Sequence, residues 1–101
     1  MVLYLLGEEN DSLSLKEAVA GLEPRQVLEA LVDAIENVFG PGSAKLVFRT
    51  LELVYKLDSE AIPSNIERFD ELLDRIFGAG AIPLRRRIVS ELERKRRQQQ
   101  Q

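Results

Sequence analysis

The chain contains no cysteine and no histidine. Without cysteine there are no disulfide bonds and no thiolate nucleophiles, and without histidine the chain lacks imidazole acids, bases and metal ligands. No serine lies in a recognisable nucleophile motif. We therefore expect a protein that is not an enzyme and that needs no cofactor and no metal.

Long apolar runs are also missing. No stretch of about 18 apolar residues, the length needed to cross a bilayer, is present. The first six residues, MVLYLL, are too few for a secretory leader and carry no basic segment before them. We expect a soluble, cytoplasmic protein without membrane partners.

The chain has 101 residues, of which 45% are hydrophobic and 31% charged, as in globular proteins. This length suits a single domain with one core. The apolar periodicity predicts an all-α bundle of four main helices plus a short N-terminal helix. We expect an apolar arm and loop over 1–13, the helical bundle over 14–97, and a frayed polar tail over 98–101.

Capping residues and prolines set the predicted boundaries. Ser14 opens the short helix with a capping-box spacing, and Ser64 does the same for the fourth. Pro24 suits the first position of the second helix, and Pro63 is expected to hold Ile62 extended. The main helices then span 24–39, 43–57, 64–77 and 81–97.

The predicted helix over 43–57 is the most apolar of the four. Its apolar side chains cover roughly 220° of a helical wheel, far more than on an ordinary surface helix. Since an exposed Leu or Phe forgoes roughly 1.5–3 kcal/mol of burial, we expect other helices to cover this one on several sides. Ser43 can cap it, and it becomes the predicted hub of the bundle.

Residues 31–42 resemble residues 69–80, which lie 38 positions later. Both segments join an acidic amphipathic helix to Phe-Gly-x-Gly and then to a further helix. The pattern predicts a duplicated helical hairpin, in which the first glycine adopts a left-handed cap and the second allows a close approach. Phosphate binding is disfavoured, because the glycine spacing matches neither the P-loop nor the dinucleotide fingerprint.

Apolar and glycine positions over about 26–93 carry a resemblance to a known family. They include Ile62-Pro63, Phe69, Leu73, the run from Ile76 to Ala81, Leu84 and Ile88. This pattern resembles the Nitrosopumilus output domain, a C-terminal helical domain of archaeal proteins. The resemblance implies a non-enzymatic module attached to sensory or regulatory proteins.

The last predicted helix is rich in cations. Residues 1–40 carry a net charge of −6, whereas residues 81–101 carry +5. A basic helix end can bind phosphates, or it can complement the helix dipole as a solvated end. The candidate nucleic-acid contacts are Arg86, Arg87, Arg94, Lys95, Arg96 and Arg97. Arg85 lies beside the core stripe instead, where we expect its guanidinium to pair with an acid of a preceding helix.

The carboxylates on the predicted helices lie opposite the apolar stripes. They are Glu29, Asp33, Glu36, Glu71 and Asp74. A metal site or an acid–base pair needs inward-facing carboxylates, so we expect these to be solvated.

Two functional interpretations remain. We favour a protein–protein interaction or oligomerisation module, which binds itself or another protein through apolar surface that the monomer leaves uncovered. The arm residues Val2, Leu3, Tyr4, Leu5 and Leu6 are the expected interaction surface, because a strand here would have no partner strand elsewhere in the sequence. The alternative is a nucleic-acid-binding accessory protein that acts through the arginine-rich last helix.

Overall fold

The fold is all-α, as predicted. A computed structural model describes residues 14–99, within which there is no strand. The α-helices are α2 (Leu15–Ala18), α3 (Pro24–Phe39), α4 (Ser43–Tyr55), α5 (Ile66–Phe77) and α6 (Ala81–Gln99). Three short 3-10 helices join them, η1 (Ser59–Ala61), η2 (Pro63–Asn65) and η3 (Gly78–Gly80). No helix in this part of the chain is long and apolar enough to cross a bilayer.

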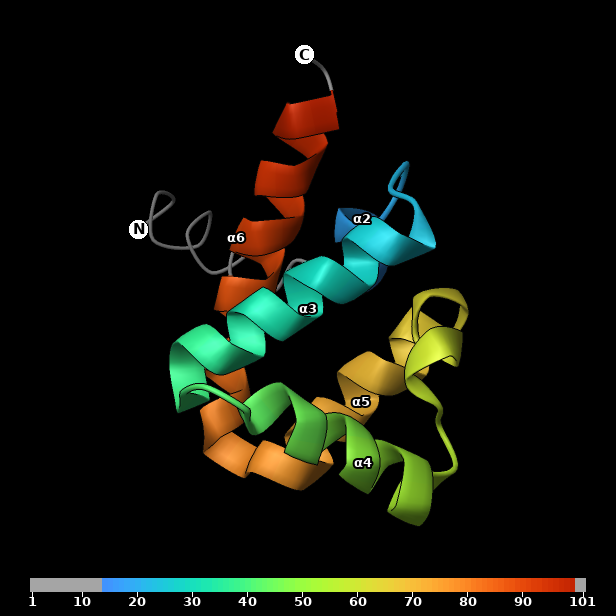
Figure 1. The fold of residues 1–101 in the computed structure, drawn as a ribbon, viewed down its shortest axis with the longest axis vertical. Helices are drawn as coiled ribbons and strands as arrows, with labels where there is room; N and C mark the ends of the chain where they lie inside the picture. The colour runs from blue at the N-terminus through green and yellow to red at the C-terminus, as the bar shows by residue number, and fades with distance from the viewer. Residues whose placement is uncertain (1–13, 100–101) are drawn as a thin grey trace, which may run out of the picture.

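Helix α3 lies at the centre of the fold and packs mainly against α6, while its other contacts reach α4, η1 and η2 (Figure 1). One face of α3 is completely buried, and two of its residues there, Ala30 and Ala34, are small enough to let a neighbouring helix approach closely. The facing stripe of α6 consists of Leu84, Ile88 and Leu92, which are 0% exposed. The buried sides of α3 and α6 thus face each other and form much of the core.

The predicted hub helix occupies the edge of the bundle instead. Only Ala44 and Leu51 of α4 are buried, whereas Leu46, Leu53 and Val54 are 68%, 61% and 63% exposed. The prediction that other helices cover α4 on several sides is wrong. The core lies mainly between α3 and α6. Helix α4 therefore packs against this core with one face only, and its other apolar face lies in solvent.

Local backbone geometry ends α4 earlier than predicted. Lys56 adopts a left-handed conformation with φ of 58°, which stops the helix at Tyr55. Leu57 therefore turns back toward the core, where it is 4% exposed and its backbone N donates to the Leu51 carbonyl at 3.0 Å. At the other end Ser43 is the first helical residue and Gly42 the cap, so the predicted Ser43 cap is also wrong.

The helix starts at Ser14 and Pro24 agree with prediction. Ser14 Oγ accepts a hydrogen bond from the Glu17 backbone N at 3.4 Å and caps α2. Pro24 is the first residue of α3, where Glu23 and Gln26 form a reciprocal capping box. Both starts follow from local rules that need no tertiary contact.

The start of α5 differs from prediction. Ile62 has φ −59° and ψ −45°, so the residue before Pro63 is helical rather than extended. Ser64 Oγ donates to the Ala61 carbonyl at 3.2 Å, and Asn65, not Ser64, is the N-cap residue. The chain enters α5 through two consecutive 3-10 turns, which place Ile62 in the core at 0% exposure. Burial of Ile62 thus outweighs its local preference before proline.

The last helix continues two residues beyond its predicted end. Gln99 belongs to α6, and its Nε2 donates to Gln26 Oε1 at 3.2 Å. Gln98 is also helical, while 100–101 lie outside the described residues. The end of α6 is therefore tied to the start of α3.

Both repeat segments fold as a helix, a glycine turn and a further helix. Gly40 and Gly78 follow α3 and α5 with φ of 107° and 56°, which glycine adopts readily, but their ψ angles of 169° and −127° show that neither forms the predicted left-handed cap. The close approach predicted at the second glycine is absent at Gly42, where an added Cβ would meet no atom within 4 Å.

Candidate protein-interaction surface

The outer face of α4 forms an apolar stripe that consists of Leu46, Thr50, Leu53 and Val54. Residues three, four and seven positions apart lie on one side of a helix, and these four follow that spacing. All four are exposed. The Thr50 hydroxyl donates to the Leu46 carbonyl at 3.0 Å, so the helix itself satisfies the only polar side chain of the stripe. The α4 stripe therefore has no side-chain polar group that requires water.

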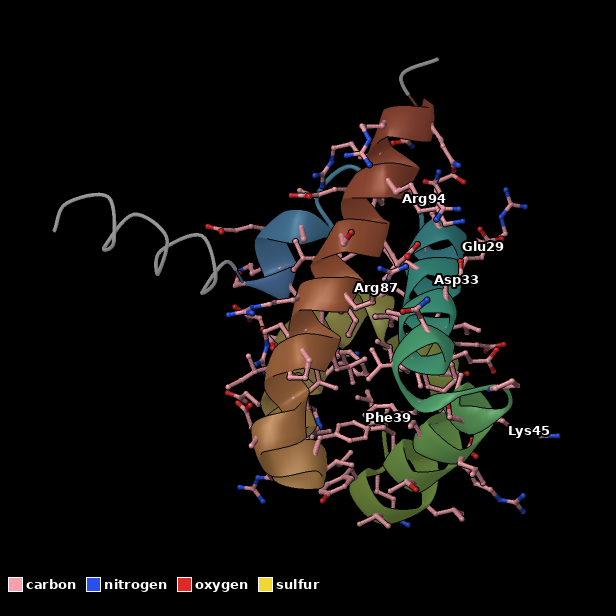
Figure 2. All side chains as sticks on the ribbon, turned by 90° about the vertical axis from the view of Figure 1, so that its left-hand side faces the viewer. Glu29, Asp33, Phe39, Lys45, Arg87 and Arg94 are labelled. Atoms are coloured by element: carbon pink, nitrogen blue, oxygen red, sulfur yellow. The ribbon has the colours of Figure 1, made fainter. Side chains whose placement is uncertain are left out.

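Charged side chains run along one flank of the α4 stripe. Lys45, Arg49 and Glu52 are exposed, and none of them forms an ion pair or hydrogen bond through its side chain with any residue of 14–99. Figure 2 shows Lys45 extending away from the body of the protein. Beside them a groove of about 440 Å³ is lined by Lys45, Phe48, Arg49, Glu52, Leu53 and Ser59. These charges are available to a partner without breaking an existing ion pair.

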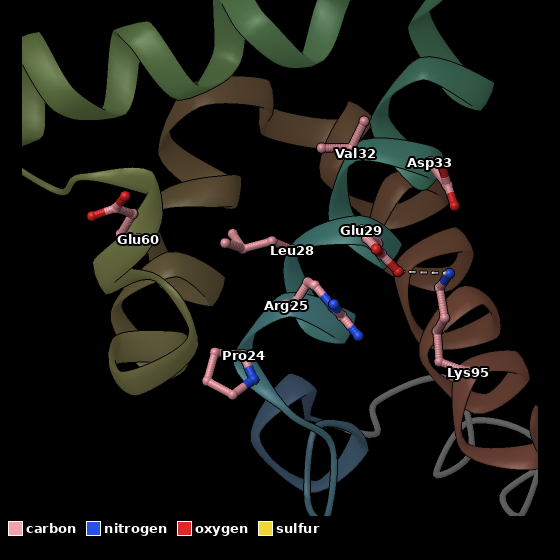
Figure 3. Close-up of a pocket in the computed structure, with 8 residues that line it drawn as sticks. All are labelled: Pro24, Arg25, Leu28, Glu29, Val32, Asp33, Glu60 and Lys95. Atoms are coloured by element: carbon pink, nitrogen blue, oxygen red, sulfur yellow. Dashed lines mark hydrogen bonds and ion pairs between the residues drawn. The ribbon is translucent and has the colours of Figure 1, made fainter. Parts of the chain in front are cut away.

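A second depression lies between α3, α6 and η1 (Figure 3). It has a volume of about 610 Å³ and is lined by Pro24, Arg25, Leu28, Glu29, Val32, Asp33, Glu60 and Lys95. The half-buried Leu28 and Val32 supply apolar wall, and Lys95 Nζ pairs with Glu29 Oε1 at 3.2 Å. Within residues 14–99 no group of three or more acidic side chains is arranged to hold a metal ion.

Two of the predicted nucleic-acid contacts bind a buried acid. Glu91 is only 4% exposed, and its carboxylate lies 3.1 Å from Arg87 Nη2 and 3.5 Å from Arg94 Nη1. Both arginines lie on the side of α6 toward α3 (Figure 2). Arg87 was a candidate phosphate contact, but its side chain is 41% exposed and is paired with Glu91. These two cations balance a charge inside the protein.

Two further cations join α6 to other helices. Lys95 makes the ion pair with Glu29 of α3, although Glu29 was expected to be simply solvated. Arg96 Nη2 donates to the carbonyls of Ala18 and Ala20, at the end of α2. These bonds satisfy carbonyls that the short helix leaves without partners. Arg86 and Arg97, the other two predicted contacts, are exposed.

The predicted pairing of Arg85 is confirmed. Its Nε lies 2.6 Å from Asp70 Oδ1, and its Nη2 lies 3.0 Å from the Asp70 carbonyl and 3.3 Å from Asp74 Oδ1. Burial lowers the pKa of Arg85, but hydrogen bonds and charges from Asp70 and Asp74 outweigh it, so the pKa is raised. Asp70 Oδ2 also accepts from the Leu15 backbone N at 3.5 Å. Asp70 therefore connects α2, α5 and α6.

Sequence reasoning missed the outer face of α4 and the burial of Glu91. Glu91 lies three residues after Ile88 and next to Leu92, which is the spacing of the α6 core stripe. That spacing could have identified it. The exposure of α4 has no such local signal, because its sequence looks suited to burial on all sides.

The arm residues Val2, Leu3, Tyr4, Leu5 and Leu6 lie outside the described residues, so their expected role stays a prediction. No protein-family model, no curated protein and no solved structure matches the chain. The resemblance to the Nitrosopumilus output domain likewise stays a prediction from apolar and glycine positions.

Proposed function

We propose that this domain is a non-enzymatic protein-interaction module whose contact surface is the α4 stripe. The observation that carries the proposal is the exposure of Leu46, Leu53 and Val54, each above 60%, on one helix. Covering such a side chain contributes roughly 1.5–3 kcal/mol. A partner that covers all three side chains would gain most of this burial free energy, because the side chains are exposed in the monomer.

Within residues 14–99 the α4 stripe supplies no contact to the buried core. The opposite face of α4 supplies its core contacts, through Ala44 and Leu51, and the neighbouring Phe48 and Tyr55 are half-buried. Substitutions in the stripe should therefore affect binding without unfolding the domain. An exposed apolar patch whose residues are not needed for folding is typical of an interaction surface.

Protein is a better candidate partner than nucleic acid. Four of the six cations proposed to contact phosphates already bind carboxylates or backbone carbonyls within the protein, as described for Arg87, Arg94, Lys95 and Arg96. A phosphate would have to compete with these bonds. The net charge of −3 would also weaken attraction to a polyanion. A regulatory or signalling output role, as the family resemblance implies, fits a module that binds protein.

Site-specific photocrosslinking in living cells tests this proposal. A photoreactive amino acid at Thr50 in the α4 stripe should yield protein adducts, because a bound partner lies within reach of that position. The same residue at Glu71, an exposed position of α5, is the matched control. Adducts at position 50 that disappear with Leu46→Glu and Leu53→Glu support the proposal. Equal adducts at both positions, or none at position 50, contradict it.

A truncation tests the arm separately. If Val2–Leu6 contributes to the interface, deletion of 1–6 should reduce the yield of position-50 adducts. An unchanged yield would restrict the interface to residues outside the arm and refute the arm prediction.

A further inference from the structure

We propose that the partner of the α4 stripe is a second copy of this chain, with the two α4 helices packed antiparallel about a two-fold axis. The inference rests on the proposed function and names its partner. The axis passes between Arg49 and Thr50, midway between Leu46 and Leu53. Two-fold dimers are the commonest closed assemblies, and in them one surface patch contacts its own copy.

The spacing of the leucines suits this arrangement. Leu46 and Leu53 are seven residues apart, so they lie about two turns apart on the same side of α4. In an antiparallel pair with the axis midway between them, Leu46 of one copy lies level with Leu53 of the other. Thr50 then lies near the axis, where a small side chain allows the two helices to approach. The apolar stripe of each copy therefore covers that of the other.

The charged flank makes the antiparallel orientation specific. A two-fold axis perpendicular to both helices places equivalent flanks on the same side, so the flank with Lys45, Arg49 and Glu52 faces its own copy. At a rise of about 1.5 Å per residue, Glu52 of the second copy lies level with the midpoint between Lys45 and Arg49. It is about 3 Å from each of them, measured along the helix axis. Each copy thus offers two cations around the acid of the other. The two Arg49 side chains lie about 1.5 Å apart along the helices, and each is within reach of the Glu52 of the other copy, which offsets their repulsion.

Parallel packing lacks this complementarity. A two-fold axis along the helices would place the charged flank of one copy against the far edge of the other copy's α4 stripe, where Thr50 and Val54 lie. Lys45, Arg49 and Glu52 would then face side chains that cannot pair with them. The antiparallel arrangement is the one that pairs charges left without ion pairs within residues 14–99.

The size of the interface predicts a weak, reversible dimer. Helix α4 has 13 residues and is therefore about 20 Å long. One such helix from each copy should bury less than about 1,200 Å², the range of transient complexes. We expect a dissociation constant in the micromolar range, so that dimers form only when the protein is concentrated.

Charge complementation in purified protein tests the pairing. Lys45→Glu with Arg49→Glu makes the flank wholly acidic, and Glu52→Lys makes it wholly basic. Acidic groups in the first half of α4 and a basic group in its last turn agree with the helix dipole, so both variants should fold. Each variant alone should dimerise at least about tenfold more weakly than the native protein, because like charges meet. An equimolar mixture should recover dimers that contain one copy of each.

Cysteine crosslinking tests the orientation, since the native chain has no cysteine. Thr50→Cys, near the axis, should form a disulfide-linked dimer under mild oxidation. Leu46→Cys and Leu53→Cys should crosslink more efficiently when mixed than when separate. Ile82→Cys, at a position 54% exposed on α6, is the control and should remain monomeric. More efficient crosslinking of separate Leu46→Cys and Leu53→Cys than of their mixture would show a parallel pair and overturn the proposal.

Sedimentation of the native protein distinguishes failure of this inference from failure of the proposed function. A concentration-dependent increase in mass at micromolar protein, together with recovery in the charge mixture, supports the second copy as partner. A native protein that stays monomeric at several hundred micromolar overturns the dimer. In that case persistent adducts at position 50 in cells would leave the interaction module standing with a different protein partner, and their absence would refute both.

Discussion

Phe39 and Phe77 stack on each other, with ring centroids 5.0 Å apart and an interplanar angle of 13°. They occupy equivalent positions of the two repeat segments, 38 residues apart in sequence. Each is the last residue of its helix, just before a glycine with positive φ. The repeat therefore brings its own equivalent residues into contact where α3 and α5 end.

This stack should couple the stabilities of the two helix ends. We expect Phe39→Leu and Phe77→Leu to be non-additive in denaturant unfolding, with a coupling free energy of about 0.5–1.5 kcal/mol. The double variant completes the cycle and isolates the pair. Additive effects would show that the two rings merely lie close together.

Arg85 should contribute more to stability than an exposed arginine of the same helix. Arg85→Ala leaves Asp70, which is 21% exposed, without its main partner, and we expect a loss of about 1–3 kcal/mol in the free energy of unfolding. Arg97→Ala is the control and should change it by less than about 0.5 kcal/mol. Equal effects of the two substitutions would contradict the role of Arg85.

The pKa of Arg85 predicts how that contribution depends on pH. Burial lowers the pKa of Arg85, but the hydrogen bonds and charges of Asp70 and Asp74 raise it by more, so the net shift is upward. A raised pKa gives stability that is fully present below the unfolded-state value and is lost only as pH rises through the folded-state value. Since arginine stays charged far above neutral pH, the difference in stability between the native protein and Arg85→Ala should be constant between about pH 6 and 10. A difference that falls within this window would contradict the assignment.

Glu91 should be a stabilising residue although it is a charged one. Glu91→Ala leaves Arg87 and Arg94 without their shared carboxylate, and we expect a loss of about 1–3 kcal/mol. Glu93→Ala removes an exposed acid from the same helix and should have little effect. Thermal unfolding of both variants measures the difference, and a Glu93→Ala effect as large as that of Glu91→Ala would refute the prediction.

Arg96 should act locally on α2. Its guanidinium binds the carbonyls of Ala18 and Ala20, so Arg96→Gln should weaken the docking of this four-residue helix. We expect amide hydrogen exchange to accelerate by about tenfold or more in α2, with little change in α3. Uniform acceleration across the domain would indicate global destabilisation instead.

Local sequence rules predicted some parts of this fold and failed at others for physical reasons. The bounds of α3 follow from Pro24 and the glycine after Phe39, and the Arg85 pairing follows from its place beside the core stripe. The position of α4 could not be predicted, because its apolar arc shows how much surface can be buried but not which helix takes the centre. Ile62 likewise adopts a helical conformation because tertiary burial outweighs the local preference before Pro63.

The assignment of α3 as the centre can be tested directly against α4. Leu31→Ala removes a side chain that is 0% exposed in α3 and should cost about 2–5 kcal/mol. Leu46→Ala removes one that is 68% exposed in α4 and should cost less than about 0.5 kcal/mol. Equal losses of unfolding free energy for Leu31→Ala and Leu46→Ala would contradict the central position of α3 and support α4 as the central helix.

The outer face of α4 is proposed to bind a second copy of the chain and not to be needed for folding. Sedimentation equilibrium of the native protein and Leu53→Glu, at matched concentrations with helix content monitored by circular dichroism, tests this proposal most directly. We expect the native protein to form dimers at micromolar to hundred-micromolar concentration, whereas Leu53→Glu should be a fully helical monomer throughout. A Leu53→Glu protein that dimerises as strongly as the native chain, or that loses its helices, would contradict the proposal.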